Sequence, residues 1–111
     1  MIQSVTMESS ETRKQLVQLL SADFSMDEDH FLILQDGNRE LREKVKSVID
    51  HFLQSDFEKL LHIMYRLDID ESLFKAVISG TYGNDVSGKL ADIVLERELK
   101  KMETRKRYKD D

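Results

Sequence analysis

Side chains that could do chemistry are few in this sequence, and histidine is the first type to consider. The chain has His30, His51 and His62 and no cysteine, so a thiolate nucleophile, a thiolate metal site and a disulfide are excluded. Neither His51 nor His62 is followed at i+3 or i+4 by the second histidine or carboxylate that zinc and di-iron helices use. A hydrolase or metal enzyme built on these two histidines would need carboxylates that converge from other helices. We expect no catalytic residue, no metal and no cofactor, and hence a protein that is not an enzyme.

An acidic segment between two apolar stripes has the spacing with which a calcium loop begins. Asp68, Asp70 and Ser72 alternate with other residues, as the first ligands of such a loop do. The sixth position is Leu73 where the loop needs glycine, and the twelfth is Ser79 where it needs glutamate. Helix capping explains these acidic residues more simply than a cation site.

A glycine-containing segment partly matches a phosphate-binding loop. Gly83, Gly88 and Lys89 have the spacing of G-x-x-x-x-G-K-[ST], but Leu90 stands where the serine or threonine belongs. No buried strand is predicted before the segment, and the loop needs one. We interpret it as a connection between helices.

One short stretch has the residue types of a protein-binding surface. Tyr65 and Arg66 follow each other, and tyrosine and arginine are enriched at binding hot spots. In the plainer interpretation, which we favour, Tyr65 covers the edge of the core. Arg66 then pairs with Asp68 or Asp70.

The C-terminal segment is rich in lysine and arginine and could contact nucleic acid or an acidic protein. Its interleaved Glu98 and Glu103 more simply indicate a solvated helix face with ion pairs between successive turns. Residues of this C-terminal segment, together with Tyr65 and Arg66, form the possible interface that we name. These are Tyr65, Arg66, Leu99, Met102, Arg105 and Tyr108.

The elements that position these groups are predicted from apolar spacing, most clearly between Ser55 and Ile78. The first half of this stretch has an i, i+3, i+4, i+7 stripe, which only a helix gathers on one face. Ser55 and Glu58 have capping-box spacing, so we place the helix start at Ser55. Asp70 can cap a second, shorter helix. The stripe of the first helix comprises Phe57, Leu60, Leu61, Met64 and Leu67, and that of the second Leu73, Phe74, Val77 and Ile78.

The remaining helices are predicted in the same way. A first helix covers about 10–24, and Asn38 can cap a third that breaks before the Ser55 helix, although the apolar register would also allow one continuous helix. Asp85 can cap a long last helix to about residue 103. Between the first and third, Ser25 and Glu28 repeat the capping-box spacing before an apolar run at 31–34. That run fits a short helix or a strand, and we choose a helix that ends at 36–37.

Composition fits one all-α domain. The chain has 111 residues, 35% of them charged, with four glycines and no proline, which suits helices and leaves few turn formers for a sheet. The net charge is −5, divided into +2 over 96–111 and −7 over 1–95. This overall acidity argues against general affinity for nucleic acid or anionic membranes. With no secretory signal or apolar run of about 20 residues, we expect a cytoplasmic protein without a membrane span.

Two segments of the C-terminal half carry a resemblance. The stretch from Asp56-Phe57 to Ile69, with its apolar stripe followed by Tyr-Arg-hydrophobic-Asp, and the basic helix from Leu95-Glu96-Arg97 to Arg105-Lys106 are similar to small uncharacterised bacterial all-helical proteins, a family of unknown function. The resemblance implies a bacterial cytoplasmic protein and carries over no activity.

We therefore expect a single-domain bundle of about five helices with a long C-terminal helix. The predicted organisation is a flexible N-terminus at 1–9, a helical domain at 10–103 and a polar basic tail at 104–111. The function that we expect is a non-enzymatic interaction or assembly module. Its partner would be a second copy, in a two-fold homodimer through the last helix or the Tyr65 region, or another protein. The alternative is a nucleic-acid-associated accessory protein that uses the basic tail and Tyr108.

Overall fold

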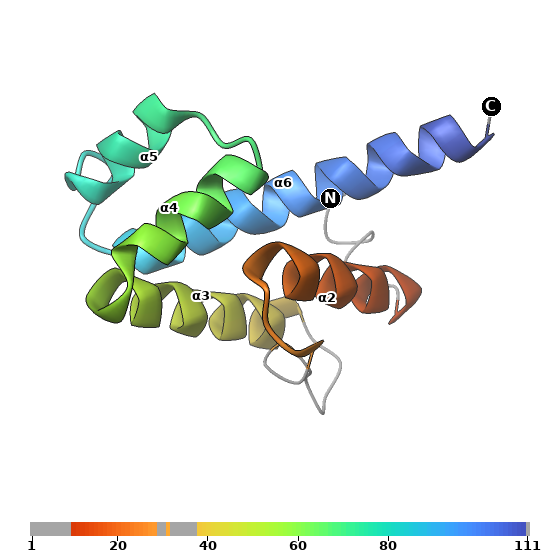
Figure 1. Cartoon of the computed structure of the whole chain (residues 1–111), viewed down its shortest axis with the longest axis horizontal. Helices are drawn as coiled ribbons and strands as arrows, with labels where there is room; N and C mark the ends of the chain where they lie inside the picture. The colour runs from red at the N-terminus through yellow and green to blue at the C-terminus, as the bar shows by residue number, and fades with distance from the viewer. Residues whose placement is uncertain (1–9, 29–30, 32–37, 111) are drawn as a thin grey trace.

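The computed structural model describes residues 10–28, 31 and 38–110, and over these residues it forms α-helices and no strand. The predicted all-α, single-domain bundle with a long C-terminal helix is confirmed (Figure 1). Of the helix expected between 25 and 37, most lies outside the described residues. The helices are α2 (Ser10–Phe24), α3 (Asn38–Ser55), α4 (Phe57–Arg66), α5 (Glu71–Ile78) and α6 (Val86–Asp110).

The pairing of α3 with α6 is the most extensive in the bundle. Arg42, in the first half of α3, reaches Asp92 and the carbonyl oxygen of Gly88, and Lys46, one turn later, reaches back to Asp85. Because residue numbers rise along α3 while those of its partners fall, the two helices run antiparallel. The other three helices complete the bundle: α2 packs against α6 and α4, α4 also against α3, and α5 against α6.

The core is made of the apolar stripes that the sequence predicts. The inner positions of α2 (Leu16, Val17, Leu19, Leu20 and Phe24) and the main ones of α3 (Leu41, Val45, Ile49 and Phe52) are buried, with Val48 and Leu53 half-buried beside them. From the other helices come Leu60, Ile63, Met64, Leu67, Phe74, Val77, Leu90, Ala91, Val94 and Leu95. Burial of one large apolar side chain is worth about 1.5–3 kcal/mol, so the shared core accounts for most of the bundle's cohesion.

The predicted break between α3 and α4 is confirmed, but the prediction that Ser55 caps α4 is wrong. Asp56, not Ser55, is the N-cap, and its side chain accepts a hydrogen bond from the backbone N–H of Lys59 at 3.2 Å. Ser55 is still the last residue of α3, where its hydroxyl donates to the carbonyl oxygen of His51 at 2.7 Å. A hydroxyl that closes one helix in this way does not cap the next.

Ser25 likewise does not begin a helix. Its φ of 55° is left-handed, and the N–H of Met26 donates to the carbonyl oxygen of Ser21 at 3.0 Å, as at the C-terminal end of a helix. Ser25 therefore terminates α2, which contradicts its predicted capping role.

The predicted caps at Asp70 and Asp85 are confirmed, whereas the side chain of Asn38, the predicted cap of α3, lies outside the described residues. Asp70 accepts from the N–H of Ser72 at 3.1 Å at the start of α5, and Asp85 accepts from the N–H of Gly88 at 3.1 Å at the start of α6. The predicted connection between α5 and α6 is a turn in which Gly80 and Gly83 have φ of 88° and 111°. Gly88 and Lys89, also assigned to this connection from the sequence, belong instead to the first turn of α6. α6 then continues as a helix to Asp110, past the end of α2 (Figure 1). In the described part of the chain, no helix has the length and apolar character needed to cross a membrane.

Candidate functional site

One side of α4 presents large apolar side chains to solvent. Tyr65 is 71% exposed and Phe57 is 42% exposed, and half-buried Leu61 lies between them at i+4 from one and i−4 from the other. The spacing places all three along one stripe of the helix. We call Phe57, Leu61 and Tyr65 the α4 stripe. The structure does not place Tyr65 over the core, contrary to the interpretation favoured from the sequence.

The start of the α4 stripe is fixed by an aromatic contact. The ring centroids of Phe57 and Phe74 of α5 lie 6.0 Å apart with an interplanar angle of 36°. Such pairs contribute about 0.5–1.5 kcal/mol beyond the burial of their area. Phe57 is thus anchored at one edge and exposed at the other, while the adjacent side of α4 is buried in the core through Leu60, Ile63 and Met64.

Another side of α4 borders a polar cleft of about 360 Å³ against the end of α2. Arg66 projects here, and its Nη2 donates to the carbonyl oxygen of Ala22 at 3.3 Å. The expected pairing of Arg66 with Asp68 or Asp70 is therefore wrong, because Asp68 lies 4.0 Å from Arg97 and Asp70 caps α5. The cleft is lined by Asp23, Ser25, Asp56, Glu58, Lys59, His62, Ile63 and Arg66.

The lining of this cleft has the character of a charged surface groove. Both acidic and basic side chains line it, and Ile63 is its one large apolar residue among those described. Sites for small organic ligands are mostly apolar with a few polar groups that converge. The lining of this cleft is instead mostly charged or polar, so we propose no catalytic reaction there.

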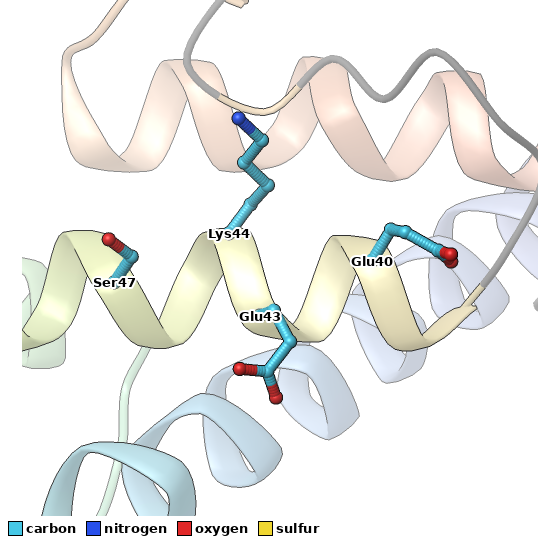
Figure 2. Close-up of a pocket in the computed structure, with 4 residues that line it drawn as sticks. All are labelled: Glu40, Glu43, Lys44 and Ser47. Atoms are coloured by element: carbon cyan, nitrogen blue, oxygen red, sulfur yellow. The ribbon is translucent and has the colours of Figure 1, made fainter.

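A second hollow, of about 350 Å³, lies on the exposed side of α3 (Figure 2). Its lining residues, Glu40, Glu43, Lys44 and Ser47, follow one face of the helix. Figure 2 shows the side chains of Lys44 and Glu43 pointing in opposite directions, toward different neighbouring segments. The four side chains therefore do not converge on a common point where a ligand could be held.

The end of α2 and the middle of α6 enclose a group of buried charges. Glu98 is fully buried, and Lys101 Nζ lies 3.7 Å from its Oε1 and 2.9 Å from Asp23 Oδ2. Burial, followed by a hydrogen bond and charge repulsion from Asp23, raises the pKa of Glu98 to about 8, while Lys101 and Arg105 act in the opposite direction. The predicted solvated position of Glu98 is therefore wrong.

The signal that would have found this cluster is present in the sequence. Glu98 lies four residues after Val94, three after Leu95 and four before Met102, which places it inside the apolar stripe of α6. A charge at such a position is expected to have a buried partner. Sequence periodicity does not identify that partner, because Asp23 belongs to a helix 75 positions earlier in the chain.

The residues named as a possible interface lie in different surroundings. Tyr65 is exposed on the α4 stripe, and Arg66 lines the cleft. Leu99 and Met102 are half-buried against the core. Arg105 is exposed, and Tyr108 belongs to α6 but its side chain is outside the described residues.

The histidines that lie within the described residues have separate environments. The ring of His51 lies 5.7 Å from that of Phe52, and its Nδ1 is 3.4 Å from the hydroxyl of Ser55, whereas His62 lines the cleft. Over the described residues, no group of three or more histidine, aspartate or glutamate side chains is arranged to hold a metal ion. His30 lies outside them.

Comparison with known proteins adds no relative to this description. No family model, curated protein or solved structure matches the chain. The resemblance of its C-terminal half to small bacterial helical proteins stays a prediction.

Proposed function

We propose that the protein is a non-enzymatic interaction module that assembles as a two-fold homodimer through the α4 stripe. The observation that carries the proposal is the exposure of Tyr65, at 71%, in line with Leu61 and with the 42% exposed Phe57. Single exposed apolar side chains are common on protein surfaces. Here two aromatic residues and a leucine share one stripe, and aromatic side chains dominate the binding energy of interfaces.

The charges of α4 suit pairing with a second copy of itself. Its first turn contains Glu58 and its last turn contains Arg66. When two copies of α4 pack antiparallel across a two-fold axis, the acidic start of one lies near the basic end of the other, and the helix dipoles also oppose. A two-fold arrangement repeats this contact twice, so α4 is self-complementary in charge as well as in its apolar stripe.

The other location expected for a homodimer, the last helix, has less to offer. Leu99 and Met102 continue the apolar side of α6, but both pack against the core and are half-buried within one subunit. Little apolar surface of these two residues is left for a partner. We therefore place the subunit contact on α4.

Light scattering after size exclusion tests the assignment. At micromolar to millimolar concentration we expect about twice the chain mass of 13.0 kDa for the wild-type protein and a monomer for Tyr65→Glu, because a charge within the apolar contact has no partner. Tyr82→Glu is the matched control, since Tyr82 is 52% exposed but lies in the turn after α5. It should remain dimeric. A monomeric wild-type chain at millimolar concentration, or a dimer that Tyr65→Glu leaves intact, contradicts the proposal.

The alternative, a nucleic-acid-associated accessory protein, is favoured by one observation. α6 stays helical to Asp110, so its basic residues lie on one continuous helix that extends past α2 (Figure 1). Binding to DNA or RNA that weakens steeply with added salt, and that is lost when the chain ends at Lys101, would support this alternative. No binding at low salt would dismiss it.

A further inference from the structure

We propose that Asp23, Glu98 and Lys101 form a proton-controlled latch between α2 and α6. The latch is closed while the two carboxyl groups share one proton, and it opens when that proton is lost. Opening weakens the attachment of α2 to the rest of the bundle. The latch is separate from the α4 stripe and does not depend on the homodimer.

The geometry sets one cation against two acids. Lys101 Nζ lies 2.9 Å from Asp23 Oδ2 and 3.7 Å from Glu98 Oε1. The Glu98 side chain has no exposed surface, and those of Asp23 and Lys101 are 11% and 23% exposed. Lys101 can neutralise one carboxylate, and its closer partner is Asp23. The second acid, Glu98, is thus left without a charge partner of its own in a place that water does not reach.

A shared proton resolves this imbalance. Neither oxygen of Glu98 accepts a hydrogen bond from any described residue. Two ionised carboxylates are both acceptors and cannot bond to each other, whereas a protonated Glu98 can donate to Asp23. A buried ionised carboxylate with no partner costs several kcal/mol, so the group takes up a proton instead. This agrees with the raised pKa of Glu98, about 8.

Several other charged groups on α6 and on the helices that pack against it have partners other than Glu98. On its own helix Glu98 also feels Arg105, which favours the ionised form. On α2 the second buried charge, Arg13, has an interaction of its own. Charged contacts of α3 and α5 include Arg42 with Asp92 and Glu43, Lys46 with Asp85, and Lys75 with Glu71. Asp23 shares the polar cleft with His62, and histidine changes charge in a similar pH range, so a test must separate the two.

Loss of the proton from Glu98 weakens the packing of α2 because that helix has few other contacts with the bundle. It packs against α6 and α4, and its buried face, with Leu16, Leu20 and Phe24, depends on those contacts. When Glu98 ionises, two carboxylates repel each other across the α2–α6 contact with one lysine between them. Water must then enter, and the simplest route is separation of the end of α2 from α6.

Hydrogen exchange on the full-length chain at pH 6 and pH 9 tests the latch, after correction for intrinsic exchange rates. In the wild-type protein we expect protection of the α2 amides to fall about a hundredfold more than that of the α4 amides, since each pH unit of differential proton binding changes an equilibrium about tenfold and about two such units separate pH 6 from the pKa of Glu98, about 8. In Glu98→Gln the side chain keeps its shape and a donor for Asp23 but cannot ionise. Protection of its α2 amides should not depend on pH.

Two control variants isolate the group that titrates. Glu96→Gln removes an exposed carboxylate two residues away on the same helix, and His62→Gln removes the histidine of the cleft. Both should behave like the wild-type chain. If Glu98→Gln does not fold, the titration of the Glu98 carboxyl carbon by NMR in the wild-type chain still decides the question.

Three results would overturn the latch. They are a wild-type pH dependence in Glu98→Gln, a Glu98 carboxyl that titrates in the ordinary carboxyl range, and an equal loss of protection in α2 and α4. The last result would mean that pH acts on the whole bundle and not on the attachment of α2.

Discussion

Two of the charged contacts that attach α6 to its neighbours differ in their access to water. Near the start of α6, Arg42 of α3 meets Asp92 with Nε to Oδ1 at 2.7 Å and Nη2 to Oδ2 at 3.3 Å. Their side chains are 33% and 53% exposed. Further along the helix, Lys101 contacts Asp23 and the fully buried Glu98. In the first contact, Arg42 also pairs with Glu43, Nη1 to Oε2 at 3.2 Å, and all three charged groups are in water. In the second contact, one cation lies with two acids away from water.

The comparison shows that similar residue types have different roles at two places on α6. An exposed ion pair gains little free energy, because water already solvates its charges well. A buried, unbalanced group cannot be solvated, so its charge state depends on a proton and its contribution to stability depends on pH. The predictions below are ordered by the size of the expected effect, and each tests whether the two contacts are as different as their surroundings indicate.

The largest effect is expected for Lys101→Met. Methionine keeps most of the apolar stem of lysine but removes the positive charge, which leaves Asp23 and Glu98 together with no cation at hydrogen-bond distance. Loss of one partner of a buried ion pair costs about 3 kcal/mol, and we expect that decrease in the free energy of unfolding at pH 7, measured with urea. A decrease below about 1 kcal/mol, the size seen for surface pairs, would make this contact equivalent to the one at Arg42.

The next effect concerns the pH dependence of stability. Because the folded-state pKa of Glu98, about 8, lies above the ordinary carboxyl value of 4.5, the folded protein retains a proton that the unfolded chain has released between these values. The contribution is fully present below pH 4.5 and is lost as the pH rises to about 8. We expect Glu98→Gln to be more stable than the wild-type chain by about 2 kcal/mol at pH 6, since the difference in proton binding there extends over about 1.5 pH units above 4.5, with little difference at pH 4.5.

Urea unfolding across this pH range measures the difference, and Glu96→Gln serves as the reference for removing a glutamate from α6. Equal pH profiles for wild type and Glu98→Gln would show that the buried acid behaves like an exposed one.

The smallest effect is expected for Arg42→Met. An exposed bidentate pair contributes about 1 kcal/mol or less, so the free energy of unfolding should fall by that amount at low salt. The difference from the wild-type chain should shrink when about 1 M salt is added and should stay constant between pH 5 and pH 9. A pH-dependent difference here would remove the contrast with the Glu98 contact.

The helices could be predicted from the sequence because their apolar residues recur at helical spacing and the core uses those stripes directly. The caps show where such reasoning stops. Ser55 and Asp56 are adjacent and both can cap a helix, and the choice between them depends on where α3 ends. Ser25 has the same capping-box spacing but takes a left-handed conformation at the end of α2. A local pattern states which residues are able to cap, and tertiary packing decides which of them do.

The candidate site was less predictable for a related reason. Tyr65 was named from its residue type, and the structure shows that it is exposed. Glu98 was assigned to a solvated face because lysine and arginine lie at the spacing of helical ion pairs, and such pairs are usually exposed. Its burial depends on α2, which the spacing of residues within α6 cannot reveal.

The contact between α2 and α6 also has a consequence for the order in which the protein forms during synthesis. Lys101 is made 78 residues after Asp23, and at typical translation rates this delay is about 4–16 s. Until the middle of α6 leaves the ribosome, Leu16, Leu20 and Phe24 lack the helix against which much of their surface packs. The nascent chain therefore carries an uncovered apolar helix for seconds, and a chaperone that binds such segments has its best opportunity at α2.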